Sequence, residues 1–172
     1  MLYLLCIMKK PISTQQTESN IREVLRLLGK TPDQLERLSK GMSEEQLRAS
    51  LGKGERSFAQ VLAHLTHCEA VTADSIQLAL LREEPLLPGI HPERELGKLL
   101  HLEKLPFTDL LAYFRTRRNI LLQVLESLTP EKWSRPLREP GKQRRETVYW
   151  QARALALHEL EHLTDLEEKM RV

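Results

Sequence analysis

The sequence predicts an all-α fold, a four-helix bundle with short accessory helices, and three observations lead to it. Four long stretches repeat apolar residues at helical spacing, so each would have one apolar face. Glycine is scarce, at 7 of 172 residues, while Leu, Glu, Arg and Lys, which favour helices, are abundant. No stretch shows the β-branched pattern that is typical of strands. Helices with apolar faces and no sheet to cover bury those faces against one another, as in a bundle.

Helix-capping patterns set the predicted boundaries. Ser57-Phe58-Ala59-Gln60 has the form of a capping box, and the same Ser-x-x-Gln pattern begins at Ser43. Thr31-Pro32-Asp33-Gln34 has the form of a helix start, and Gly29 stands where a preceding helix would end. The predicted long helices are residues 17–40, broken at Gly29, then 58–83, 107–127 and 145–170, and the short ones are 44–50 and a turn after Thr129 that carries Trp133. The proline-rich segment 84–105 is expected to be held by packing, without regular structure.

Residues 17–172 are predicted to form a single domain, preceded by a flexible segment at residues 1–16. The apolar stretch in the first ten residues is too short to span a bilayer, which takes about 20 residues. Its lysines follow the apolar part, which is the wrong order for a signal peptide. Two cysteines, Cys6 and Cys68, make no disulfide framework, so a cytoplasmic location is the simpler interpretation. A net charge of +2 and 5% aromatic residues argue against nucleic acid as a partner, and no membrane partner is expected.

Two histidines, His158 and His162, are the most informative residues of the chain. They stand four apart in the last predicted helix, so both imidazoles project from one face and can reach a single metal ion. His64, in the second long helix, is predicted to face the interior and to complete a set of three. Three protein ligands with an open fourth position are typical of catalytic zinc. Hydrogen-bonded core histidines would give the same pattern, and a His-x-x-x-His pair alone arises by chance in many helices.

Two further residues stand close to His64 on the same helix. His67 comes three residues later and is a candidate for an alternative ligand, or for a side chain that contacts the ligands and orients them. Cys68 comes one turn later, and a closed His-Cys-His-His site would be structural rather than catalytic. Packing, or contact with the ligands, is the favoured interpretation for both residues. Nothing in the sequence links His91 or His101 to this site.

The two histidine-bearing helices also carry a family resemblance. Phe58-Ala59-Gln60-Val61-Leu62-Ala63-His64-Leu65-Thr66-His67-Cys68-Glu69 resembles the second-helix signature of the DinB superfamily of damage-inducible, YfiT-like proteins. Leu157-His158-Glu159-Leu160-Glu161-His162-Leu163 resembles its fourth-helix signature. The resemblance implies a bundle of up-down-down-up type, often dimeric, with a metal site whose ligands would be His64, His158 and His162. Phe58, His67 and Asp165 depart from the family's pattern, in which Trp, Asp and Gln are frequent at these places.

The resemblance also implies an activity. Characterised relatives include thiol-dependent transferases and isomerases that act with bacillithiol or mycothiol. A divalent transition metal (Zn, Ni, Mn or Fe) would favour the thiolate of a low-molecular-weight thiol, and the chain would be a metal-dependent thiol S-transferase. A metal-dependent hydrolase and a non-enzymatic bundle that metal stabilises are the alternatives. No catalytic residue is assigned beyond the ligands. The expected partners are a thiol or other small-molecule substrate and a second copy of the chain, for which Leu157 and Leu160 widen the apolar surface.

Overall fold

The computed structural model describes residues 12–141 and 145–170. Four long helices dominate it: α1 (Glu18–Ser39), α3 (Phe58–Leu81), α5 (Phe107–Glu126) and α7 (Val148–Lys169). The short elements are α2 (Glu44–Arg48), the π-helical turn η1 (Pro92–Gly97), α4 (Lys98–Leu100), the 3-10 turn η2 (Leu102–Lys104), α6 (Pro130–Trp133), and the strands β1 (Pro136–Leu137) and β2 (Glu146–Thr147). The two strands pair antiparallel, with Pro136 opposite Thr147. The prediction of an all-α fold with short accessory helices is therefore confirmed.

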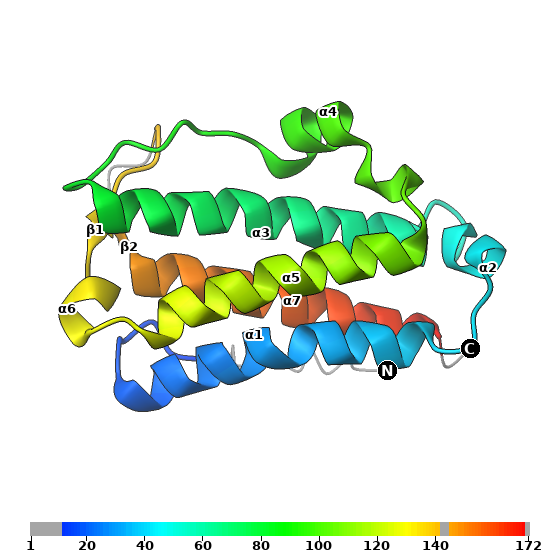
Figure 1. Cartoon of the computed structure of the whole chain (residues 1–172), viewed down its shortest axis with the longest axis horizontal. Helices are drawn as coiled ribbons and strands as arrows, with labels where there is room; N and C mark the ends of the chain where they lie inside the picture. Colours follow the sequence, from blue (N-terminus) through cyan, green and yellow to red (C-terminus); the bar gives the residue numbers. More distant parts are fainter. Residues whose placement is uncertain (1–11, 142–144, 171–172) are drawn as a thin grey trace, which may run out of the picture.

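The helices form a bundle of up-down-down-up type, also as predicted. In Figure 1, α1 and α7 run in one direction, and α3 and α5 run in the other. Helices α1 and α3 each pack against both α5 and α7. The three histidines of the predicted site therefore come from two neighbouring antiparallel helices, α3 and α7. None of the described helices is both long and apolar enough to cross a membrane.

The described chain begins with a segment that is tied to α7. Residues 1–11, which make up most of the segment predicted to be flexible, lie outside the described residues. Ile12 is buried in the core. The Arg153 guanidinium donates to the Ile12 carbonyl from Nε at 3.0 Å and from Nη2 at 2.8 Å, and the Tyr149 hydroxyl donates to the Ser13 carbonyl at 2.7 Å. These contacts bring the chain to the start of α1 at a defined place.

The predicted break in the first helix is wrong, because α1 continues through Gly29 and Pro32. Proline lacks the N–H that would bond to the carbonyl four residues earlier, so a helical Pro32 leaves the Leu28 carbonyl without its usual donor. That carbonyl accepts instead from Nη1 of Arg118, at 2.6 Å. The hydroxyl of Thr31 does not cap a helix start. It lies within hydrogen-bond distance of the Leu27 carbonyl, at 3.2 Å, and of the Glu159 carboxylate, at 2.9 Å. Contacts from distant parts of the sequence thus outweigh the local stop signal.

The expectation that residues 84–105 lack regular structure is also wrong, since this segment contains η1, α4 and η2. His91 is the N-cap of η1, and its Nδ1 accepts from the backbone N–H groups of Glu93 at 3.2 Å and Arg94 at 3.3 Å. The carboxylate of Glu95 accepts from the His91 N–H at 2.7 Å. This exchange of hydrogen bonds works as a capping box does, with an imidazole in place of a hydroxyl.

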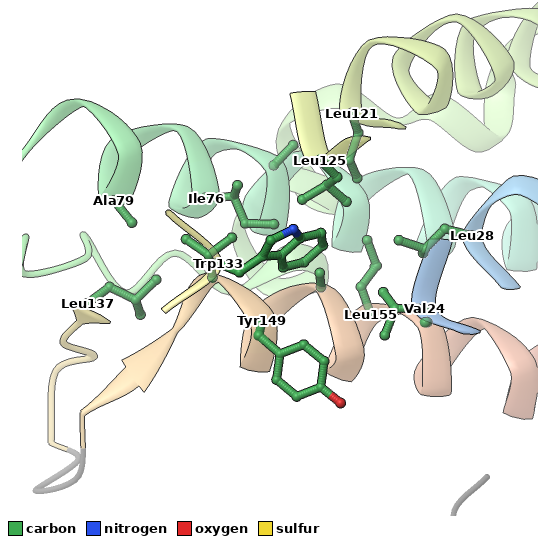
Figure 2. Close-up of a cluster of buried hydrophobic side chains, with 14 of the residues drawn as sticks. Val24, Leu28, Ile76, Ala79, Leu121, Leu125, Trp133, Leu137, Tyr149 and Leu155 are labelled. Carbon is green, nitrogen blue, oxygen red and sulfur yellow. The ribbon is translucent and has the colours of Figure 1, made fainter. Parts of the chain in front are cut away.

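The apolar core consists of two clusters, one toward each end of the bundle. The first includes Ile76 and Ala79 of α3 and Leu125 of α5, and the second includes Phe58 and Leu62 of α3. Figure 2 shows the first cluster, in which the indole of Trp133 from α6 lies among the side chains of the long helices. Its ring centroid is 6.4 Å from that of Tyr149, in an edge-to-face arrangement. The short helix α6 therefore closes this end of the bundle.

A layer of polar side chains separates the two clusters, and we call it the polar layer. It consists of one residue from each long helix: Thr31 of α1, Glu69 of α3, Arg118 of α5 and Glu159 of α7. All four are buried. Along α3 and α7 the layer lies at the level of the predicted metal ligands, because Glu159 follows His158 and Glu69 follows Cys68. The core is thus divided at the height of the candidate site.

Helix α3, which carries His64, begins at a complete capping box. The Ser57 hydroxyl accepts from the Gln60 N–H at 3.2 Å, and the Gln60 side chain accepts from the Ser57 N–H at 2.8 Å. Replacing Ser57 by Ala is expected to lower the free energy of unfolding by about 1 kcal/mol, since one N–H loses its acceptor. Urea denaturation measures this, with the exposed Ser127→Ala as a control expected to change it by less than about 0.5 kcal/mol. Equal losses in both variants would contradict the role of the cap.

Candidate metal centre

The structure brings the imidazoles of His64, His158 and His162 together between α3 and α7. The ring centroid of His64 is 5.0 Å from that of His158 and 4.8 Å from that of His162, and the two α7 rings are 4.6 Å apart. The Nε2 atoms of His64 and His158 are 2.9 Å apart. One nitrogen from each ring can be chosen so that all three lie within 4.8 Å of one another. All three residues are half-buried, so their nitrogens converge at the edge of the core.

Burial favours the neutral, metal-binding form of His64 and of His162 by lowering the pKa of each. Burial, with help from the charge of Arg56, lowers the pKa of His64 to about 3. Burial, with help from His158, also lowers the pKa of His162. A neutral imidazole has a lone pair to give, whereas a protonated one does not. Three converging imidazoles are a donor set that suits Zn, Ni and Fe, so the residues present fit a divalent transition metal.

Glu93 of η1 orients His64, and it is a site residue that the sequence did not reveal. Its Oε1 is 2.9 Å from Nδ1 of His64 and 2.5 Å from a guanidinium nitrogen of Arg56. A carboxylate in this position keeps the imidazole proton on Nδ1, so the lone pair of His64 is on Nε2, the atom that faces His158. Carboxylate–histidine pairs of this kind commonly support metal ligands. The sequence carries a sign of the η1 turn, in His91-Pro92-Glu93, but none of its contact with α3.

His67 and Cys68, predicted to lie near the ligands, have different surroundings. The Cys68 sulfur is 3.7 Å from Nε2 and 3.8 Å from Nδ1 of His64, and 3.6 Å from Nε2 of His158. Because its distances to the two nitrogens of His64 are nearly equal, the sulfur lies along the lone pair of neither nitrogen. Burial raises the pKa of the Cys68 thiol to about 12, so the group is a thiol here. The buried His67 packs on η1, where a Cβ on Gly97 would lie 3.7 Å from its ring. Their predicted role of orienting the ligands stays a prediction.

A cavity of about 320 Å³ opens at His64. Its lining contains both charges and aromatic rings: Arg56, Gln60, Ala63, His64, His67, Glu93, Gly97, Lys98, His101 and Glu103. His101, which no sequence pattern connected with the candidate metal site, therefore lines the same cavity as His64. Arg56 and Lys98 give this cavity two cationic groups near the candidate ligands. The cavity is large enough to admit a small molecule to His64, the candidate ligand in its lining.

The polar layer holds α3 and α7 in register behind the three histidines. Arg118 donates from Nη1 to Glu159 at 2.9 Å and from Nη2 to Glu69 at 3.1 Å, and a second contact joins Nη2 to Glu159. Burial raises the pKa of Glu69 to about 7. Because Glu159 is the neighbour of His158 in α7, the ion pair fixes the helical turn that carries this histidine. The geometry of the candidate site is therefore supported from the core as well as from η1.

Comparisons with known proteins agree with this fold. The sequence profile of the DinB superfamily matches residues 27–166. Among solved structures, YfiT from Bacillus subtilis, described as a probable metal-dependent hydrolase with an unusual four-helix bundle topology, aligns with a TM-score of 0.81 at 18% identity, over 92% of this chain and 90% of its own. A protein from Streptococcus pneumoniae aligns with a TM-score of 0.64 at 16% identity, over 92% of both chains.

A mycothiol-dependent maleylpyruvate isomerase also aligns, with a TM-score of 0.65 at 17% identity. The alignment covers 85% of this chain but only 60% of the isomerase, so the isomerase has a large part without counterpart here. No curated protein matches this chain. At these identities the solved structures show a shared fold, while the match of the sequence profile over residues 27–166 shows the family. This chain belongs to the DinB superfamily.

Proposed function

We propose that this protein binds one divalent transition metal through His64, His158 and His162 and uses it to transfer a low-molecular-weight thiol to a small molecule. The observation that carries the proposal is the convergence of three imidazole nitrogens within 4.8 Å, where one of the three residues, His64, also lines a cavity. Such a site has three protein ligands and leaves a coordination position for a small molecule, as catalytic sites do. The description of one structural neighbour as mycothiol-dependent supports a thiol as the co-substrate.

The chain's own residues would bind and orient the reactants. Glu93 holds the proton of His64 at Nδ1, and Arg56 holds Glu93 in place. Lys98, at the cavity wall, offers a positive charge to a carboxylate of the thiol. A divalent metal held by the three histidines would supply Lewis acidity, which favours the thiolate form of a thiol or activates water. The thiol of the half-buried Cys68 lies 3.7 Å from Nε2 of His64 and 3.6 Å from Nε2 of His158.

A metal-dependent hydrolase is the second candidate, and the description of YfiT as a probable metal-dependent hydrolase favours it. The third is a non-enzymatic bundle in which metal only stabilises the fold. The predicted homodimer and cytoplasmic location stay predictions. Of the two leucines expected at a dimer seam, Leu157 is buried inside the bundle and Leu160 is half-buried.

Metal content and thiol binding test the proposal together. Protein purified without added metal is expected to contain about one equivalent of a transition metal by elemental analysis. Adding N-acetylcysteine to the cobalt-loaded protein is expected to produce a sulfur-to-cobalt absorption band, and N-acetylserine is not. The Cys68→Ser variant serves as the control for a band that arises from the protein's own sulfur. Protein that neither contains nor takes up metal would refute the metal site, whereas bound metal without a thiol band would favour the hydrolase.

Replacing Glu93 by Gln is expected to weaken metal binding by about 10- to 100-fold, because His64 loses the carboxylate that fixes its proton on Nδ1. Competition with a chromophoric chelator measures the affinity. The matched control is Glu103→Gln, which changes another acidic residue of the same cavity that contacts His101 and not His64. Equal affinities in wild type and Glu93→Gln would show that Glu93 does not support a ligand.

A further inference from the structure

A second cavity, of about 570 Å³, lies beside the candidate metal centre and includes none of its three histidines. Four parts of the chain line it: α3, the segment before and within η1, the turn after β1, and α7. The lining residues are Val71, Asp74, Ser75, Leu78, Leu87, Pro88, Gly89, Ile90, His91, Pro92, Arg94, Leu96, Glu139, Pro140 and Gln151. Its volume is within the range of small-molecule binding sites, which is about 300–1,000 Å³.

The cavity continues the helix faces that carry the histidines. Val71 comes seven residues after His64 on α3, and Gln151 comes seven residues before His158 on α7. Seven residues are about two helical turns, which return to the same face, and antiparallel helices carry both steps in the same direction. The turn η1 lies at the border, because Glu93 contacts His64 while its neighbours Pro92 and Arg94 line the second cavity. A ligand in this cavity would therefore lie next to the metal centre.

Backbone contacts hold the walls of the cavity in place. The Leu87 N–H donates to the Arg138 carbonyl at 2.8 Å, and the Arg138 N–H donates to the Pro85 carbonyl at 2.9 Å. Gly89 has a φ of +71°, and a Cβ there would lie 3.1 Å from Cγ of Pro140, so this wall requires glycine. His91 caps η1 at the other end, as described above. A preformed cavity costs little free energy to order when a ligand binds.

The lining indicates the chemistry of the ligand. Most of the side chains are aliphatic or proline rings, which suit an alkyl or aryl body. Since Nδ1 of His91 accepts two backbone N–H groups, its proton is on Nε2, which is a donor. Arg94 is exposed and pairs with no acidic residue in the part of the chain that the structure describes. The acidic residues of the lining lie elsewhere: Glu139 accepts from Gln151 at 3.0 Å, and Asp74 is exposed on α3. The two hydrogen-bond donors, Arg94 and the Nε2–H of His91, therefore lie together at the η1 end of the cavity.

We propose that this cavity binds the apolar body of an organic acid, with the acidic group at Arg94 and at the Nε2–H of His91. This step rests on the proposed function in one respect: the bound acid would be the acceptor substrate of the neighbouring metal centre. Binding itself needs only the cavity, so it can be measured without metal. The chemical class is an aryl or alkyl carboxylate, sulfonate or similar anion.

Fluorescence titration with 8-anilinonaphthalene-1-sulfonate, an aryl anion, tests the proposal. Saturable binding of one equivalent is expected. Ser75→Phe adds a ring to the cavity wall and is expected to weaken binding by about tenfold or more, which is about 1.4 kcal/mol. The matched control is Gln77→Phe on the same helix, where the exposed side chain does not line the cavity. Should Ser75→Phe fail to fold by circular dichroism, Val71→Phe, at a half-buried position of the same wall, takes its place.

The charge of the ligand is tested with a neutral probe, N-phenyl-1-naphthylamine. Arg94→Gln is expected to weaken binding of the anionic probe about fivefold and to leave binding of the neutral probe within about twofold. Equal losses for both probes would overturn the assignment of the acidic group, and equal affinity in wild type and the phenylalanine variants would overturn the cavity itself. His158→Ala, which disturbs only the metal centre, is expected to bind the anionic probe as wild type does. Failure of the metal proposal would thus leave this result standing.

Discussion

Replacing Arg118 by methionine is expected to lower the free energy of unfolding by about 3–5 kcal/mol, because it leaves two buried carboxylates without their cation. Arg118, Glu69 and Glu159 all have fully buried side chains. The substitution also removes the donor to the Leu28 carbonyl, which Pro32 cannot supply. Urea denaturation at neutral pH measures the loss. Methionine keeps most of the side-chain volume, so a cavity would contribute little to the result.

Arg115→Met is the matched control on the same helix. Arg115 pairs with Asp33 at 2.9 Å and with Glu36 at 2.8 Å, but its side chain is 38% exposed. Exposed ion pairs contribute at most about 1 kcal/mol, so this variant is expected to be nearly as stable as wild type. The deficit of Arg118→Met should shrink as the pH falls, because protonation removes the charge of the unpaired carboxyls. A deficit that does not depend on pH would show that packing, not charge, accounts for the loss.

His158→Ala is expected to weaken metal binding on the order of a hundredfold to ten-thousandfold. The binding free energy of zinc held by a few protein side chains is about 10–16 kcal/mol, and losing one of three ligands is expected to remove about a third of it. Competition with a chelator of known affinity measures the change. The metal-free variant should fold like wild type, because the lost imidazole is half-buried and the ion pair of Glu159 is untouched.

His101→Ala is the control for this experiment, since His101 lines the cavity at His64 but its side chain is 50% exposed and contacts Glu103. It is expected to keep the affinity of wild type. If His158→Ala and wild type bound metal equally tightly, the three histidines would not be the ligand set. If His158→Ala lost metal and also unfolded, the metal would be structural, which would favour the non-enzymatic alternative.

The helices that could be predicted from the sequence are those whose ends are set by neighbouring residues. The capping box at Ser57 and the apolar repeat after Phe107 place α3 and α5 to within a few residues. The pattern at Thr31-Pro32 is equally local, yet α1 passes through it. Arg118 bonds to the Leu28 carbonyl, which Pro32 leaves without a donor, and Glu159 accepts from the Thr31 hydroxyl. Arg118 and Glu159 come from two other helices, and no local pattern contains them.

The candidate site also contains residues that could be predicted from the sequence and one that could not. The spacing of His158 and His162 is a property of one helix, and the inward face of α3 places His64 opposite them. Glu93 could not be found, because it reaches His64 through the path of the segment between α3 and α5, which helical periodicity does not describe. The proline-rich composition of that segment suggested irregular structure, whereas its imidazole cap at His91 organises it.

The polar layer also has a consequence for how the chain folds. Its hydrogen bonds join residues that are 41, 49 and 128 positions apart in the sequence. Contacts between such distant residues form only after the chain between them has closed into a loop, which costs entropy early in folding. We therefore expect the layer to assemble late, once the apolar clusters on either side have brought the four helices together. Interactions absent from the transition state slow unfolding and leave the folding rate nearly unchanged. The layer would set how long the folded chain persists, rather than how quickly it forms.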